Sequence, residues 1–154
     1  MLQNLYPHLL AFHNLLRWVV LAAVLAAILV ALSGWSGAKP ASPLLLRLGI
    51  VFVIAIDLDF LTGLLLYFGA SPITRAALSD FGAAMKSFEP RFFAVEHSLL
   101  MFLAVICAHA GGIMIRKGRT DQAKCRGAAV AWLFALLFML IGIPWWRPLI
   151  RLAS

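Results

Sequence analysis

Four long apolar runs dominate the chain and are separated by polar stretches rich in glycine and proline. The runs cover about residues 9–32, 44–68, 92–115 and 128–146. A membrane-crossing helix needs roughly 20 mostly apolar residues, and each run approaches or exceeds that length. The first run lacks a basic segment before it and a small-residue cleavage site, so we expect a retained helix and not a signal peptide. The pattern predicts an all-α protein with four transmembrane helices.

The segments between the runs indicate how the helices are connected. Residues 33–43 and 116–127 form short links, whereas the link at 69–91 is longer. In the longer link, Ser79 and Asp80 can cap a short helix that lies at the membrane interface. Short links favour a four-helix bundle with up-down-up-down topology. The sequence has neither an internal repeat nor a soluble domain, so we expect one integral membrane domain over residues 1–154.

Composition supports a membrane protein. Hydrophobic residues make up 64% of the chain and charged residues only 12%, whereas soluble domains have about 25% charged residues. The net charge of +7 lies mainly in the links, which is typical of positive-inside topology and does not call for nucleic acid. The two short links carry more Lys and Arg than the opposite side, so we expect both termini on the outer side. Cys107 and Cys125 show no metal-ligand spacing and receive no role.

Seven titratable or charged side chains lie inside the apolar runs, where each costs several kcal/mol and marks a candidate functional site. They are His13, Arg17, Asp57, Asp59, Glu96, His97 and His109. At about 1.5 Å per residue, His13 and His97 lie at nearly the same depth below the outer ends of parallel helices. Gly63 and Gly142 lie at the same level in the other two helices. Two imidazoles and two glycines in one layer predict a haem b with His13 and His97 as axial ligands.

The remaining polar residues suggest supporting roles. Arg17 lies one turn below His13 and Asp59 one turn below Gly63, so an Arg17–Asp59 ion pair is geometrically allowed. Beside this structural role, a cofactor-binding role stays open, in which Arg17 tunes the haem or contacts a quinone headgroup. Asp57 lies deeper on another face, where a structural role and a proton relay both remain open.

Glu96 points about 100° away from His97 and can pair with Arg91. Arg91, Arg75 and Lys86 lie on the histidine side and are candidates for binding haem propionates. His109 has no evident axial partner and is expected near the inner interface. His8 follows Pro7 at the start of the first run and is turned about 140° from His13, so it is expected to be interfacial, with its use as the ligand in place of His13 left open.

Four stretches resemble a known group of proteins. HNLLRW (13–18), LTGLLLYF (61–68), SDFGAAMKSFEPRFFAVEHSLLM (79–101) and IPWW (143–146) are similar to a family of small four-helix bacterial membrane proteins often labelled cytochrome b. The resemblance implies a b-type haem, electron transfer, a role for His13 and His97, and a place in the bacterial inner membrane with periplasmic termini. Members of that family often carry histidine where this chain has Asp57.

The leading hypothesis is a membrane cytochrome that passes electrons between a quinol or a partner protein and an acceptor near the outer face. Electron transfer is favoured over stand-alone catalysis. A second hypothesis is a cofactor-free accessory subunit of a larger respiratory or photosynthetic complex. A third is a proton-coupled transport component that uses Asp57, Asp59 and Arg17. The expected surroundings are lipid, with a larger membrane complex or a homodimer as partner.

Overall fold

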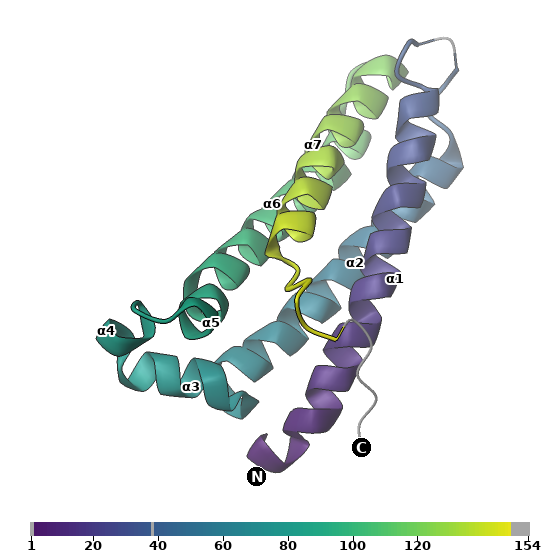
Figure 1. Ribbon diagram of the computed structural model, residues 1–154. Helices are drawn as coiled ribbons and strands as arrows, with labels where there is room; N and C mark the ends of the chain where they lie inside the picture. The colour runs from purple at the N-terminus through teal and green to yellow at the C-terminus, as the bar shows by residue number, and fades with distance from the viewer. Residues whose placement is uncertain (1, 38, 149–154) are drawn as a thin grey trace.

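The computed structural model describes residues 2–37 and 39–148, which form helices and turns without any strand (Figure 1). The all-α prediction is therefore confirmed for this part of the chain. A short 3₁₀ turn, Leu2–Leu5, precedes the first long helix. The four long helices are α1 (Tyr6–Ser33), α2 (Pro43–Leu65), α6 (His97–Lys117) and α7 (Asp121–Gly142).

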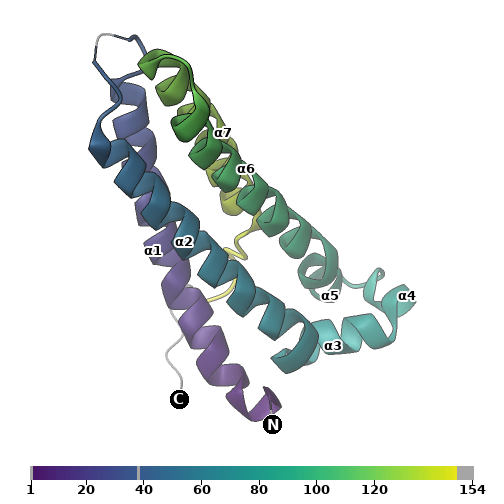
Figure 2. The same cartoon turned by 180° about the vertical axis from the view of Figure 1, so that it is seen from behind.

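Each long helix packs against two others. The contacting pairs are α1 with α2, α1 with α7, α2 with α6, and α6 with α7. The α1–α2 and α6–α7 pairs lie close together at the end that carries the short links and diverge toward the other end (Figures 1 and 2). Helix α3 lies across this wider end, so the long link between α2 and α6 is located where the two pairs separate.

That long link is largely helical, although it was predicted mainly as a loop. It contains α3 (Pro72–Ser79), α4 (Phe81–Ala84) and α5 (Phe88–Arg91). The expected cap is present, because Asp80 Oδ1 accepts a hydrogen bond from the backbone N–H of Ala83 at 2.9 Å. A wide π-helical turn joins each end of this region to a long helix, at Leu66–Ala70 and at Phe92–Glu96.

Helix α7 begins and ends earlier than the predicted run at 128–146. It begins after Thr120, whose hydroxyl accepts a hydrogen bond from the backbone N–H of Ala123 at 3.1 Å. It ends at Gly142 because Ile143 precedes Pro144, and the residue before a proline is driven out of the helical region. Ile143 accordingly has extended backbone angles. The apolar run continues past this point, which is why hydropathy alone placed the end too late.

Trp132 of α7 forms the centre of the core at the narrow end. Its indole is fully buried, lies edge-on against Phe52 with ring centroids 6.0 Å apart, and donates a hydrogen bond to the Ala108 carbonyl at 3.2 Å. Two glycines permit this packing. An added Cβ at Gly49 would lie 2.9 Å from the indole, and one at Gly111 would overlap it. Small residues thus allow α2, α6 and α7 to approach closely around one large ring.

Three helical segments are long and apolar enough to cross a membrane: Tyr6–Ser33, Phe88–Lys117 and Asp121–Gly142. Helix α2, which carries Arg47, Asp57 and Asp59 along its length, is not one of the three. The large apolar residues exposed on the outer surfaces of the long helices agree with contact to lipid. The structure therefore supports a membrane protein with at least these three apolar helices among its described residues.

Candidate functional site

A cavity of about 540 Å³ opens at the wide end of the molecule, between the two helix pairs. Most of its lining is apolar and comes from α1, α2, α6 and the segment after α7. A volume of 300–1,000 Å³ with a few convergent polar groups is typical of cofactor and small-molecule sites. The polar groups that line it include His13, Arg17, Asp59, His97, Thr74 and Arg147.

His13 projects from α1 into this cavity beside α2. Its Nδ1 lies 2.8 Å from Asp59 Oδ1 and 3.2 Å from the Asp59 backbone carbonyl, and both side chains are largely buried, with 16% and 13% exposed. An oxygen neighbour at Nδ1 holds the proton on that nitrogen, so Nε2 is the nitrogen that remains available to a ligand. Gly63 lies beside the same ring, because a Cβ there would be 3.5 Å from His13 Cε1.

His97 enters the cavity from the first residue of α6. Its Nδ1 donates a hydrogen bond to the Gly142 carbonyl at 2.8 Å. Phe92 and Phe93 lie against the imidazole, with ring centroids 6.0 and 5.8 Å from it. Because Nδ1 is protonated and the ring is held between aromatic neighbours, His97 also has Nε2 as its available nitrogen.

The two imidazoles lie next to each other across the cavity. Their centroids are 6.3 Å apart and their planes are nearly perpendicular, at 83°. These two residues are expected at one level from their positions in the sequence, and the structure brings them together. When two imidazoles bind one metal ion from opposite sides, the distance between their ring centroids is the sum of two metal–nitrogen bonds of about 2 Å and two ring radii of about 1 Å, which gives about 6 Å. The observed separation matches the spacing of two axial imidazoles on one metal ion.

The π-helical turns support the part of the wall next to His97. The Tyr67 hydroxyl, in the first turn, donates a hydrogen bond to the Ala94 carbonyl, in the second, at 2.9 Å. The Thr74 hydroxyl donates to the Tyr67 carbonyl at 2.8 Å. These two bonds tie the turn after α2 to the turn before α6 and to α3. π-turns are frequent at functional sites, where they change the direction of a side chain.

Arg17 and Asp59 are both buried and line the same cavity. Their opposite charges attract each other. The Asp59 carboxylate nevertheless lies directly against the His13 imidazole, with 2.8 Å between Oδ1 and Nδ1. The expected Arg17–Asp59 pairing thus becomes a three-residue cluster with the aspartate beside the histidine. The sequence placed the two charges correctly in depth but did not indicate which neighbour the carboxylate would contact.

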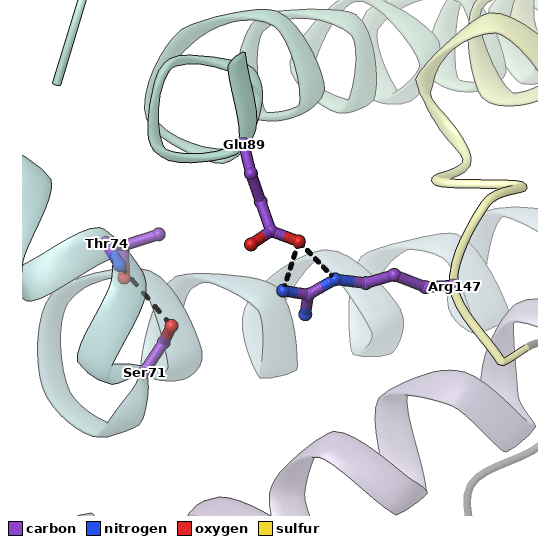
Figure 3. Close-up of polar contacts among 4 residues, drawn as sticks. All are labelled: Ser71, Thr74, Glu89 and Arg147. Carbon is purple, nitrogen blue, oxygen red and sulfur yellow. Dashed lines mark hydrogen bonds and ion pairs between the residues drawn. The ribbon is translucent and has the colours of Figure 1, made fainter. Parts of the chain in front are cut away.

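Arg147 is a cationic group at the cavity that the sequence analysis did not select. It comes from the segment after α7, and its Nη2 and Nε both donate to Glu89 Oε1, at 2.6 and 2.9 Å (Figure 3). Its guanidinium also lies over Phe93, 4.6 Å from the ring centroid. In Figure 3, Ser71 and Thr74 lie on the neighbouring helical segment, joined by the cap hydrogen bond of α3. The Glu89–Arg147 pair therefore fastens the C-terminal segment to α5 beside the cavity.

Three expected site residues lie elsewhere. Arg91 pairs with Glu96 at 2.9 Å, as expected, but its side chain is 43% exposed and is not part of the cavity lining. Gly142 is also outside the cavity lining. A Cβ there would lie 2.5 Å from Met101 Cε, so this glycine permits close packing of α7 on α6. Its backbone carbonyl accepts the hydrogen bond that holds His97. Asp57 faces away from the cavity and contacts His109, with Asp57 Oδ1 3.0 Å from His109 Nε2.

Within the described residues, no three His, Cys, Asp or Glu side chains gather as a metal cluster. Comparisons with protein-family models, curated proteins and solved structures find no match to this chain. Functional inference therefore depends on the site geometry.

Proposed function

We propose that this protein is a membrane-embedded b-type cytochrome that binds one haem b between His13 and His97 and transfers electrons. The observation that carries the proposal is the pair of imidazoles 6.3 Å apart in one apolar cavity. In each ring, Nδ1 faces an oxygen atom, which leaves Nε2 as the metal-binding nitrogen. When bound, the haem supplies one-electron chemistry at its iron.

The protein's own residues would set the properties of that site. The Asp59 carboxylate beside His13 would make this imidazole the stronger electron donor to the iron, whereas His97 has only a neutral carbonyl at the equivalent position. Arg147, and not Arg91, is the candidate for binding a haem propionate, because Arg147 lines the cavity and Arg91 does not. The apolar lining excludes water, which stabilises binding of a largely hydrophobic macrocycle.

In this proposal all four long helices cross the bacterial inner membrane as an up-down-up-down bundle. Helix α2 crosses with its Asp59 in the cavity and its Asp57 paired to His109, since pairing is the usual way a membrane interior tolerates charge. The cavity then lies near the outer face, where both termini are placed. A quinol or a partner protein would exchange electrons with the haem there. The resemblance to small bacterial cytochrome b-like proteins supports the same assignment.

The test is a visible spectrum of the purified protein expressed with added haem. We expect a b-type α band in the reduced-minus-oxidised spectrum. His13→Ala and His97→Ala should each lose the six-coordinate low-spin spectrum, and His109→Ala, as the matched control outside the cavity, should keep it.

The angle between the rings sharpens this test. Perpendicular axial imidazole planes give a strongly anisotropic low-spin ferric EPR signal, whereas parallel planes give a rhombic one, and the planes here are at 83°. A colourless wild-type protein, isolated with intact helical circular dichroism after haem supplementation, would refute the proposal and favour a cofactor-free accessory subunit.

A further inference from the structure

The His109–Asp57 pair lies on the outer surface of α6 and α2, away from the cavity. Its side chains are 47% and 39% exposed. Asp57 is eight residues from the end of α2 at Leu65, and His109 is eight residues from the end of α6 at Lys117. At about 1.5 Å per residue, each lies about 12 Å inside the nearest end of its helix. The pair is therefore far from the interfacial region of a membrane.

The surface around the pair is apolar and well exposed. On α6, Ile106 lies three residues before His109 and Ile113 four residues after it, so they share its face, and they are 48% and 44% exposed. On α2, Ile54 and Leu61 flank Asp57 at spacings of three and four and are 54% and 56% exposed. A polar pair at the centre of an apolar, lipid-facing surface is costly unless another surface covers it.

The pair has hydrogen-bonding capacity to spare. Its one contact joins His109 Nε2 to Asp57 Oδ1, and no described residue contacts His109 Nδ1 or Asp57 Oδ2. The surface thus offers one carboxylate oxygen from α2 and one imidazole nitrogen from α6, side by side at the same depth. A partner that presents the same two groups in the opposite order complements both of them.

We infer that this α2–α6 face binds a second copy of the chain, and that a two-fold axis along the membrane normal relates the two copies. Such an axis keeps the depth of every residue and places α2 of one copy against α6 of the other. Each Asp57 then lies opposite the His109 of the second copy, so the identical surface supplies the complementary hydrogen-bonding group. The exposed isoleucines around the pair form the apolar rim of the contact. The inference uses the membrane placement proposed above but does not depend on haem.

The test measures association in lipid bilayers by energy transfer between labelled copies as the lipid-to-protein ratio is raised. We expect wild type to dimerise, and Asp57→Leu/His109→Leu to weaken dimerisation at least tenfold. In Asp57→His the face carries two histidines, and in His109→Asp it carries two aspartates. Each of these chains alone should associate weakly, and mixing them should restore wild-type affinity, because opposite charges then meet across the interface.

Cross-linking checks the geometry independently of affinity. In a background where Cys107 and Cys125 are replaced by alanine, copies with Ile106→Cys on α6 and copies with Leu61→Cys on α2 should form a disulfide-linked dimer when they are mixed, because the axis places these two positions against each other. Leu29→Cys, which is 69% exposed on α1, should not. A wild-type monomer at all lipid ratios, or a double leucine variant that dimerises as tightly as wild type, would overturn the inference. The dimer should persist in the haem-free His13→Ala/His97→Ala variant, so failure of the cytochrome proposal leaves this test intact.

Discussion

Replacing Gly111 by alanine tests whether Trp132 is the fixed centre of the helix packing. An added Cβ at Gly111 would lie 2.6 Å from Trp132 Cδ1 and 2.8 Å from Trp132 Cε2. The indole cannot move aside easily, since it is fully buried and lies against Phe52. Gly112 is the matched control, because a Cβ there would meet only Val53 Cγ2 at 3.7 Å and Arg116 Nη2 at 3.9 Å.

Both substitutions gain about 1 kcal/mol of helix propensity, so this contribution cancels between them. Forcing one methyl group into a well-packed core costs about 1–3 kcal/mol. We therefore expect Gly111→Ala to be less stable than Gly112→Ala by about 1–3 kcal/mol. The measurement is reversible unfolding by SDS in mixed micelles, followed by far-ultraviolet circular dichroism.

The same experiment includes a check on mechanism. If the indole is the obstacle, the cost of Gly111→Ala should shrink in a Trp132→Leu background, with a coupling free energy of about 0.5–3 kcal/mol between the two positions. Equal stabilities of Gly111→Ala and Gly112→Ala, or an unchanged cost in the Trp132→Leu background, would refute the reasoning. The packing of α6 on α7 would then not depend on the contact between the glycine and the indole.

Other expected outcomes follow from the site and the helix ends. Asp59→Asn should raise the midpoint potential of the bound haem by about 60 mV in a redox titration, because the negative charge beside a ligand stabilises the oxidised iron. Asp57→Asn, outside the cavity, should leave the midpoint potential unchanged. Arg147→Gln should speed haem loss to an acceptor globin several-fold, while Arg91→Gln, outside the cavity, should have no effect. Thr120→Ala should cost about 1 kcal/mol in the SDS assay by removing the α7 cap, and Thr120→Ser should restore it.

The sequence predicted the helices well because run length and hydropathy are local properties. It also predicted that His13 and His97 share a level, and both line one cavity. The end of α7 was predicted four residues too late, at residue 146, because Pro144 terminates the helix while the apolar run continues. Arg147 was missed for a related reason: it lies after the last helix, and no local pattern indicates that this segment folds back over the cavity.

Contacts between helices were harder to predict, because a sequence gives a residue's position along its own helix but not the axial shift between two helices. Counted from the outer ends of their runs, Asp57 and His109 differ in depth by six residues, or about 9 Å. In the structure they are in contact, with 3.0 Å between Asp57 Oδ1 and His109 Nε2. Helix α2 ends in a π-turn at Leu66–Ala70, whereas the apolar segment containing α6 already begins at Phe88. The outer ends of the apolar runs therefore do not lie at the same depth. A depth counted from these ends identifies the contacting residues correctly only where the two runs begin at the same level.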